Sequence, residues 1–357
     1  MRLRGNETLD RIRDRISELD ALRGLAALAV MLFHYVYFYN HNYAIHPIDT
    51  SGSFFQYGAY GVHLFFIISG FVIYMTIRKC ESVKDFWVKR AIRLYPAYLT
   101  AVAFTFLATS TYSGLDSLSI SIIDALLNAT MLQGVVPGVD IPLVDGSYWS
   151  LAVELHFYVF CGMLLATGLL RSPLTISWVW MVTIYVLKLL FVAGMIHPIV
   201  GDLGIVNYSN LFIAGVMFFE LKNGKRIVPH VIIVLAAAYQ FIFFSFLSGV
   251  IVSAFYLLFY ALLTGNLRLL NNKPLIALGT ISYSLYLIHQ NVGYLILHYL
   301  EDRGFTQPGI LAVPVVVSIL LAVVITNFIE RPLQRKMLRA YGAVRAKDGS
   351  DSIPVAT

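Results

Sequence analysis

The sequence predicts an all-α, polytopic transmembrane helical bundle of about ten spans, with both termini in the cytoplasm. Hydrophobic residues make up 58% of the 357-residue chain and charged residues only 13%, whereas soluble domains are about 25% charged. Lysine and arginine gather in alternate loops, which is the pattern of a membrane protein whose basic loops stay inside the cell. These observations exclude a soluble enzyme, a secreted disulfide scaffold and a disordered chain.

Ten apolar segments are long enough to cross a bilayer, which takes about 20 residues of helix. The expected spans are 21–39, 60–77, 95–113, 148–170, 174–196, 205–221, 227–245, 247–264, 275–299 and 309–329. The first run contains Arg23 and His34 and lacks a clear small-residue exit site. We therefore expect it to stay as the first span, because a cleaved signal peptide would look different. The break between the seventh and eighth spans, near 246–249, is the least marked.

The basic residues support this order of spans. The loops after spans 2, 4, 6 and 8 carry Arg78, Lys79, Lys84, Lys89, Arg90, Arg171, Lys222, Lys225, Arg226, Arg268 and Lys273. The intervening loops at 40–59, 114–147, 197–204 and 246–249 contain neither lysine nor arginine, and the last such loop has only Arg303. This asymmetry predicts a cytoplasmic segment at 1–20, a transmembrane domain at 21–335 and a cytoplasmic tail at 336–357.

Cysteine content and net charge exclude further classes. Cys80 and Cys161 fall in or beside apolar segments, so we expect free thiols and no metal site. The net charge of +6 follows from the topology of the loops, and we expect no nucleic-acid partner. The longest outside loop, 114–147, should carry an amphipathic helix over 117–132. It is either a functional segment or a simple connector.

Ionisable residues inside the spans are the candidates for function, because burying them in lipid is costly. Arg23 and His34 are eleven residues apart, which places them about 20° apart around a helix and about 16 Å apart along it. Arg23 then lies at the cytoplasmic mouth and His34 beyond the midplane. The plainer alternatives are an arginine that extends to the membrane interface and a buried histidine with its hydrogen bonds satisfied.

Three polar residues fall at one depth in the outer half of the membrane: His34, Glu154 and His289, with His63 nearer the outer surface. A neutral histidine can accept a proton from a hydroxyl and return it. A carboxylate at the same level can orient that histidine or bind a sugar hydroxyl, and arginine at the mouth can hold a phosphate. Lys89, Arg90 and Arg93 lie at the same mouth, although topology alone would also place basic residues there.

At these residues the sequence resembles the acyltransferase-3 family of integral membrane acyltransferases, from about 17 to 335. The start "ELDALRGLAALAVMLFHY" is similar to the opening of the family and carries Arg23 and His34. Further blocks follow in order: "GVHLFFIISGFVIY" (61–74), "FWVKRAIRLYPAYL" (86–99), "SYWSLAVELHFYVF" (147–160), "ISYSLYLIHQ" (281–290) and "FIERP" (328–332). The opening and the five further blocks in the expected order make the resemblance specific.

The resemblance implies an acyl-CoA-dependent O-acyltransferase of the cytoplasmic (inner) membrane. The enzyme would move an acyl group, most simply acetyl, from cytoplasmic acyl-CoA to a hydroxyl of an extracytoplasmic carbohydrate or other acceptor, without a tightly bound cofactor. His34 and Glu154 would be catalytic, and Arg23, Arg90 and Arg93 would bind acyl-CoA. The residues expected to bind the acceptor or line the cavity are His63, Trp149, Ser150, Tyr158, Ser282, Tyr286 and His289. A fused SGNH-type domain is not expected, and glycan-assembly proteins are possible partners.

Two other hypotheses use the same buried polar groups. A proton-coupled transporter or glycan exporter fits ten spans with charges near the midplane, but the sequence shows no inverted repeat and no paired broken helices. A membrane-embedded binding or sensor module would bind acyl-CoA without turning it over. Consumption of acyl-CoA with release of free thiol distinguishes the enzyme from both.

Overall fold

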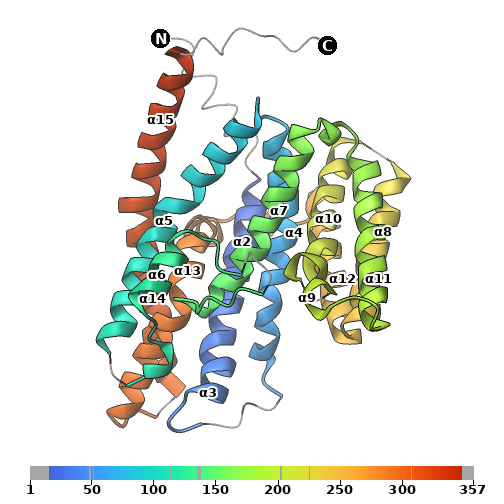
Figure 1. Ribbon diagram of the computed structural model, residues 1–357. Coiled ribbons are helices and arrows are strands. Elements are labelled where there is room, and N and C mark those ends of the chain that lie inside the picture. Colours follow the sequence, from blue (N-terminus) through green and yellow to red (C-terminus); the bar gives the residue numbers. More distant parts are fainter. Residues whose placement is uncertain are drawn as a thin grey trace.

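The computed structural model describes residues 16–47, 50, 52–112, 114–134, 138–201, 203–224, 226–306 and 308–347, and these form an all-helical bundle (Figure 1). Most of the predicted N-terminal segment, residues 1–15, and the last ten residues of the predicted tail lie outside the described residues. Within the described residues there is no β-strand. The predicted all-α class is confirmed.

Each of the ten expected spans coincides with a helical segment. The segments are α2 Ser17–Leu32 with η1 Phe33–Phe38 and α3 Tyr39–Asn42; η2 Phe54–Tyr60 with α4 Gly61–Ile77; α5 Val83–Thr111; η4 Gly146–Tyr148 with α7 Trp149–Ala166; α8 Pro173–Val192; α10 Gly204–Asn223; α11 Ile227–Phe243; α12 Phe246–Leu263; α13 Lys273–Asp302; and α14 Ala312–Val324 with η8 Ile325–Glu330. The shorter elements are η3 Asp116–Leu118, α6 Ile122–Ala129, η5 Leu169–Arg171, α9 Pro198–Gly201, η6 Arg268–Leu270, η7 Pro308–Leu311 and α15 Arg331–Lys347.

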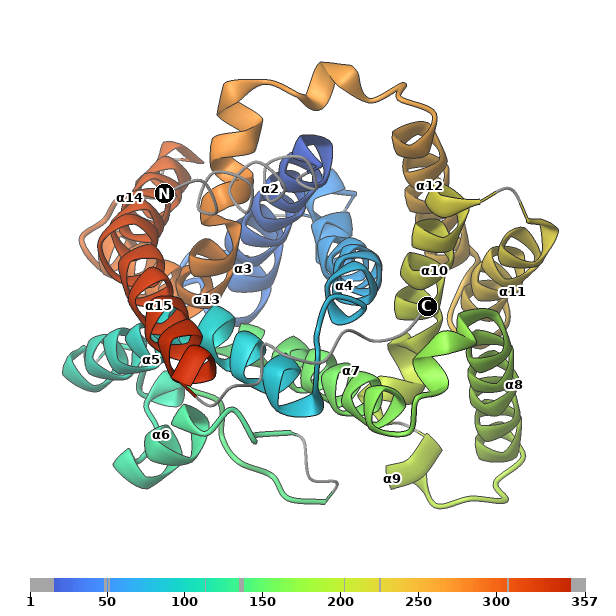
Figure 2. The ribbon, with the colours of Figure 1, turned by 90° about the horizontal axis from the view of Figure 1, so that it is seen from above.

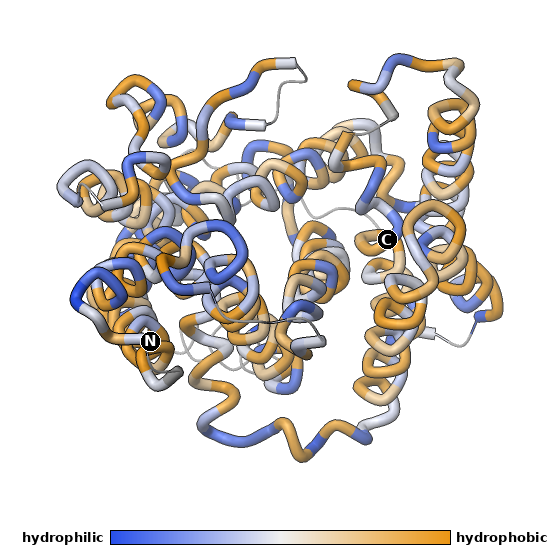
Figure 3. The backbone as a smooth tube through the Cα atoms, turned by 90° about the horizontal axis from the view of Figure 1, so that it is seen from below, coloured by the Kyte–Doolittle hydropathy of each residue, from blue (hydrophilic) through white to orange (hydrophobic). Residues whose placement is uncertain are grey.

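Among the described residues, eight helical segments are long and apolar enough to cross a membrane. The other two expected spans fall short for different reasons. α11 has only 17 residues, and α13 is 30 residues long but interrupts its apolar sequence with His289, Gln290 and Asn291. Hydrophobic residues also predominate along the outer helices of the bundle (Figure 3). The chain is a multi-pass integral membrane protein.

The helix bounds correct two details of the sequence prediction and add a third element. The third span begins at Val83 instead of residue 95, because its basic first turns continue the helix after the Ser82 cap. The amphipathic helix expected over 117–132 is reduced to the short elements η3 and α6. Beyond the last span, α15 continues the chain as a helix that projects from the bundle (Figure 1).

Close helix packing at glycines places α2 against α13, which share one side of the bundle (Figure 2). A Cβ atom at Gly24 would lie 2.7 Å from the backbone nitrogen of Gly279, and a Cβ atom at Gly279 would lie 1.9 Å from the carbonyl oxygen of Asp20. Small residues at such a contact let two helix backbones approach each other within the membrane. The contact determines how α2 and α13 present their polar residues to each other.

Replacing Gly279 by valine is expected to destabilise the bundle by about 3 kcal/mol, because backbone atoms stand where the new side chain must go. The measurement is the midpoint of thermal unfolding of the purified full chain in detergent. Gly342→Val is the matched control, since nothing lies within 4 Å of a Cβ atom there. Equal midpoints for the two variants would contradict the close contact of α2 and α13.

Candidate active site

Two histidines that are far apart in the sequence form a pair inside the bundle. His34 is the second residue of η1, and its Nδ1 lies 2.8 Å from Nε2 of His289 on α13. η1 is a turn of π-helix, a distortion that proteins use mostly at functional sites. His289 is fully buried and His34 is half-buried. We call these two residues the histidine pair.

Hydrogen bonding determines which ring nitrogens of the histidine pair carry protons. Nδ1 of His289 lies 2.9 Å from the carbonyl oxygen of Tyr286, which can only accept, so this nitrogen is protonated. Nε2 of a neutral His289 is then an acceptor, and Nδ1 of His34 donates to it. Nε2 of a neutral His34 keeps its lone pair. That is the protonation state required of a general base.

Tyr35 fixes the backbone beside the histidine pair. Its hydroxyl lies 2.7 Å from the carbonyl oxygen of His289, to which it donates, and 2.8 Å from Oγ of Ser318 on α14. Gly293 leaves the necessary room, because a Cβ atom there would lie 2.1 Å from the Tyr35 ring. The side chain of Tyr35 therefore joins η1, α13 and α14 at the level of His289.

Aromatic rings surround His34. The centroids of the Phe33, Phe38 and Tyr294 rings lie 5.0, 5.8 and 6.3 Å from that of His34. Such a setting limits the access of water and strengthens the hydrogen bond within the histidine pair, because the local dielectric constant is low.

A narrow cavity of about 120 Å³ lies between α2, α4, α5, α7 and α13. It is lined by eight of the residues predicted to form the site, namely Arg23, Arg90, Arg93, Ser150, Glu154, Tyr158, Ser282 and Tyr286. We call it the central cavity. Four other predicted residues, His34, His63, Trp149 and His289, are not in its lining.

Tyr286 connects the central cavity to the histidine pair. Its side chain lines the cavity, and its hydroxyl lies 2.7 Å from Oγ of Ser150 and 3.1 Å from the carbonyl oxygen of Ser147. Its own carbonyl oxygen binds Nδ1 of His289, and the two rings have centroids 5.7 Å apart. A shift of Tyr286 would therefore change both the lining of the central cavity and the hydrogen bond to His289. Ser282, by contrast, donates to the Gly279 carbonyl of its own helix.

Arg90 is the cavity arginine best placed to bind an anion. Its Nη2 donates to Oγ1 of Thr76 over 3.1 Å, and its guanidinium lies 5.9 Å from the ring centroids of both Phe86 and Tyr158. Its buried Nε has no hydrogen-bond partner among the described residues. A guanidinium that lies near two rings and retains an unpartnered donor suits a phosphate oxygen.

Arg93 has a different partner. Its Nη1 forms a hydrogen-bonded ion pair with Oε1 of Glu330, which is buried at the end of η8. Ser284 donates to the other oxygen of this carboxylate over 2.9 Å, and Gln334 also donates to Oε1. Part of the positive charge expected at the acyl-CoA site is thus neutralised within the protein.

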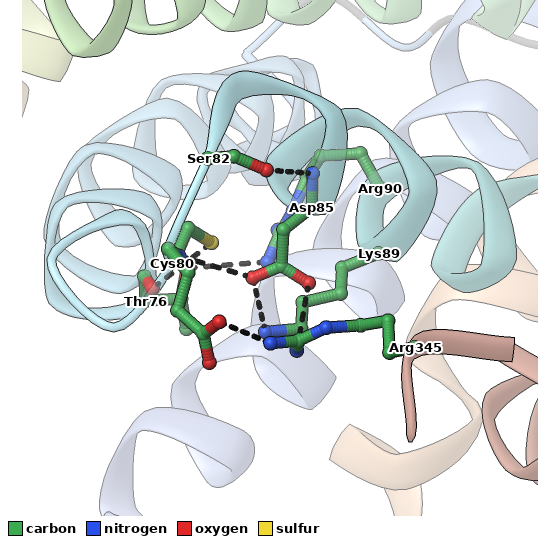
Figure 4. A network of polar contacts seen from close by, with 8 residues as sticks. Thr76, Cys80, Ser82, Asp85, Lys89, Arg90 and Arg345 are labelled. Carbon is green, nitrogen blue, oxygen red and sulfur yellow. Dashed lines mark hydrogen bonds and ion pairs between the residues drawn. The ribbon is translucent and has the colours of Figure 1, made fainter. Parts of the chain in front are cut away.

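Lys89, the third basic residue of the predicted cluster, is also neutralised. Its Nζ lies 2.7 Å from Oδ2 of Asp85, and Arg345 of α15 pairs with Glu81 and approaches Oδ1 of Asp85 to 3.8 Å (Figure 4). These contacts join α15 to the first turn of α5. Within the cluster, Arg90 remains the residue that presents its charge to the central cavity.

Glu154 does not contact His34 in the way that its depth in the membrane suggested. Its Oε1 accepts a hydrogen bond from Ser69 over 2.6 Å within the central cavity, and its charge acts on Arg23. His289 is the residue that orients His34. The sequence predicted that His34, Glu154 and His289 lie at one depth, but it could not identify which two of them are in contact.

His63 and Trp149 lie away from the histidine pair. His63 borders a separate hollow with Tyr60, Tyr208, Ser245 and Ser248, and its Nδ1 has no partner among the described residues. Trp149 borders another hollow under the loop that precedes it and packs 5.5 Å from the Tyr208 ring. The structure therefore does not bring these two residues to the candidate active site.

Sequence reasoning missed two residues that the structure places near the site. Glu330 lay in the quoted "FIERP" block, and its position directly before the basic tail could have marked it as a partner for an arginine. Asp145 is an acidic residue two positions before Ser147, in a loop for which the sequence left both a functional role and a connector role open, and it is fully buried.

In the acyl-CoA-dependent reaction that the sequence resemblance implies, the His289→Ala variant is expected to lower kcat about 100-fold with little change in the KM for acyl-CoA. His34 would lose the acceptor that fixes its tautomer, whereas the cavity arginines would be untouched. His230→Ala is the matched control, because His230 is exposed, lies outside the central cavity and contacts the Tyr260 hydroxyl. A His289→Ala variant with the kcat of the control would show that His34 needs no such partner.

Comparison with known proteins identifies the family of the chain. A family model described as an acyltransferase domain matches residues 16–328. The O-acetyltransferase OatA of Staphylococcus aureus strain NCTC 8325 / PS 47 is 25% identical over 379 residues, covering 93% of this chain and 59% of OatA. A protein of strain COL, named as an O-acetyltransferase on a provisional basis, is 26% identical over 372 residues, covering 91% of this chain and 58% of its own.

The chain thus spans a little under three fifths of the length of the curated relatives it matches. No solved structure matches the chain. The family match extends from the start of α2 into η8 and includes every helix that lines the central cavity and carries the histidine pair. The chain therefore belongs to the acyltransferase-3 family of membrane acyltransferases.

Proposed function

We propose that this protein is a membrane O-acyltransferase. It transfers an acyl group, most simply acetyl, from cytoplasmic acyl-CoA to a hydroxyl of an extracytoplasmic acceptor, a surface or lipid-linked carbohydrate. The observation that carries the proposal is the histidine pair, in which Nε2 of His34 is available as a base next to a narrow cavity containing arginine. The names of the O-acetyltransferase relatives support acetyl as the group transferred.

Acyl-CoA enters from the end of the bundle that carries Arg90. The positive loops of the sequence favour this end as the cytoplasmic one. Arg90 binds a phosphate of the nucleotide, and Arg23 lines the same cavity. The pantetheine arm then lies in the central cavity, with the thioester toward Tyr286 and the histidine pair. An apolar, narrow channel of this kind limits hydrolysis of the thioester by water.

His34 acts as the general base of the transfer. Its Nε2 accepts the proton of the acceptor hydroxyl while that oxygen forms a bond to the thioester carbonyl carbon. The carbon–sulfur bond then breaks, and the CoA thiolate takes the proton back from His34. Nε2 of His289 accepts a hydrogen bond from the Nδ1–H of His34 throughout, so the imidazolium that forms between the two steps stays oriented. The products are the O-acyl ester and free CoA.

The proposal is tested with sealed membrane vesicles that contain the full chain and the acceptors native to its membrane. Radiolabelled acetyl-CoA is added, and release of free thiol and incorporation of base-labile label into the non-protein fraction are measured. Both should appear in equal amounts, and both should be absent from vesicles that carry the His34→Ala variant. Thiol release that is no greater with the wild-type chain than with this variant would overturn the proposal. A proton-coupled exporter would leave acetyl-CoA intact.

A further inference from the structure

A carboxylate outside the spans is buried against the helix that carries His289. Asp145 immediately precedes η4, and its relative exposure is 0%. Its side chain does not line the central cavity and so does not contact the proposed donor. An isolated carboxylate is costly to bury, so the hydrogen bonds of Asp145 must offset that cost.

Asp145 accepts three hydrogen bonds, two within the outer loop and one from α13. Oδ1 accepts from the backbone nitrogen of Ser147 over 3.0 Å and from its hydroxyl over 2.6 Å. Oδ2 accepts from the backbone nitrogen of Asn291 over 3.0 Å, two residues after His289. The Asn291 amide in turn donates to the carbonyl oxygen of Val144 over 2.9 Å. Both the backbone and the side chain of Asn291 therefore form hydrogen bonds between α13 and the loop.

A continuous series of polar contacts leads from Asp145 to His34. Ser147, which Asp145 binds, lies with its Oγ 3.2 Å from the carbonyl oxygen of Tyr286. The same carbonyl binds Nδ1 of His289, whose Nε2 binds His34. The position of that carbonyl determines the tautomer of the histidine pair. A group that fixes Ser147 and Asn291 fixes α13 on both sides of His289.

We propose that Asp145 is a positioning residue of the acyl-transfer site, which in its ionised form clasps the outer loop to α13 and so holds the histidine pair in its reactive tautomer. This inference rests on the proposed function. It assigns to the loop over 138–148 a part in the reaction, in addition to its role as a connector.

The ionised form makes all three bonds at once, because the N–H groups of Ser147 and Asn291 can only donate and the Ser147 hydroxyl donates to Oδ1. A protonated carboxyl would have to place its own O–H against one of the two N–H groups, or against the Ser147 hydroxyl, which would then no longer donate to Asp145. The titratable groups that face Asp145 are all tyrosines: Tyr35 from η1, Tyr148 from η4, and Tyr286 and Tyr294 from α13. Among the described residues, no lysine or arginine forms an ion pair with it.

Burial raises the pKa of Asp145 to about 6, and the N–H groups of Ser147 and Asn291 and the Ser147 hydroxyl oppose that rise. As the pH falls through this value, Asp145 takes up a proton and the clasp loosens. The wild-type enzyme should therefore lose kcat on the acid side through protonation of Asp145 as well as through protonation of its histidine base.

The test is the Asp145→Asn variant of the full chain, which mimics the protonated state at every pH. At pH 7.5, its kcat should fall about 10- to 100-fold, while the KM for acetyl-CoA stays within about twofold, because misplacing a reacting group by an ångström can cost about 100-fold. Its acid limb should be shallower than that of the wild type by one proton. Asp116→Asn is the control, since Asp116 is exposed in the same loop.

Ser147→Ala serves as a second variant in case Asp145→Asn does not fold. It removes the hydroxyl contacts to Asp145 and Tyr286 but keeps the backbone bonds, so a smaller loss of kcat is expected, again without a change in KM. Wild-type kcat in a folded Asp145→Asn or Ser147→Ala variant, or an unchanged acid limb in Asp145→Asn, would overturn the inference. If the wild-type chain itself released no thiol from acetyl-CoA, the proposed function would fail instead, so the two failures are distinct.

Discussion

The His34→Ala variant is expected to lose acyl transfer by about 1,000-fold while the protein still folds and inserts. General-base catalysis contributes roughly 100- to 10,000-fold, and His34 is the member of the histidine pair whose Nε2 keeps a lone pair. The measurement is thiol release from acetyl-CoA by membrane vesicles, normalised to the amount of folded chain. The KM for acetyl-CoA should change little, because His34 is not in the lining of the central cavity.

The matched control for that loss is His197→Ala. His197 is an exposed histidine just before α9, away from the central cavity. It should retain wild-type kcat, which shows that the assay responds to the site and not to histidine content. Retention of more than about a tenth of the activity by His34→Ala would exclude His34 as the base, since even the lower bound for general-base catalysis exceeds that loss.

The Arg90→Gln variant is expected to raise the KM for acetyl-CoA about 100-fold with a smaller effect on kcat. Loss of a charge-assisted hydrogen bond to a partly buried phosphate costs about 2–5 kcal/mol. Arg90 is the cavity arginine whose buried Nε has no partner among the described residues, whereas Arg93 is paired with Glu330. Arg93→Gln should therefore affect stability more than it affects donor binding.

Truncating the donor separates charge recognition from general damage to the cavity. S-acetylpantetheine lacks the nucleotide and its phosphates, so its KM should be the same for the wild type and for Arg90→Gln. Arg226→Gln is the variant control, because Arg226 is exposed at the start of α11. An equal rise in KM for acetyl-CoA and S-acetylpantetheine would show that Arg90 shapes the cavity without binding phosphate.

Much of the central cavity could be anticipated from the sequence. Span hydropathy located the helices, and the motif blocks placed Arg23, Arg90, Glu154 and Tyr158 on the elements that line the cavity. Counting residues from the ends of the spans predicted that His34 and His289 lie at one depth, because the rise per residue of a helix is constant. Local periodicity and the register of the spans were enough for these assignments.

The partners of those residues could not be anticipated. The His34–His289 and Arg93–Glu330 contacts join positions 255 and 237 residues apart, and they depend on how each helix is rotated about its axis. The π-helical turn at η1 also changes the direction of the side chains that follow it, and a count of 100° per residue does not include such a turn. Glu154 was assigned to the same level as His34 but contacts Ser69.

Asp145 shows a different limit of sequence reasoning. An acidic residue in a loop between spans is expected to face water, and the sequence around it gives no periodicity that would suggest burial. Only the fold reveals that the loop lies against α13 and brings the carboxylate to the backbone of Asn291. The close packing at Gly279 could not be predicted either, because the sequence does not show whether a glycine in a span contacts another helix or faces open space.

The central claim is that this protein esterifies hydroxyl groups outside the cell, with His34 as the base. Its most direct test is the content of base-labile O-acetyl groups in surface glycans. Cells that lack the chain, cells that regain it and cells that regain the His34→Ala variant are compared. We expect the acetyl content to be restored by the wild-type chain alone. Equal restoration by the variant, or an acetyl content that does not depend on the chain, would contradict the claim.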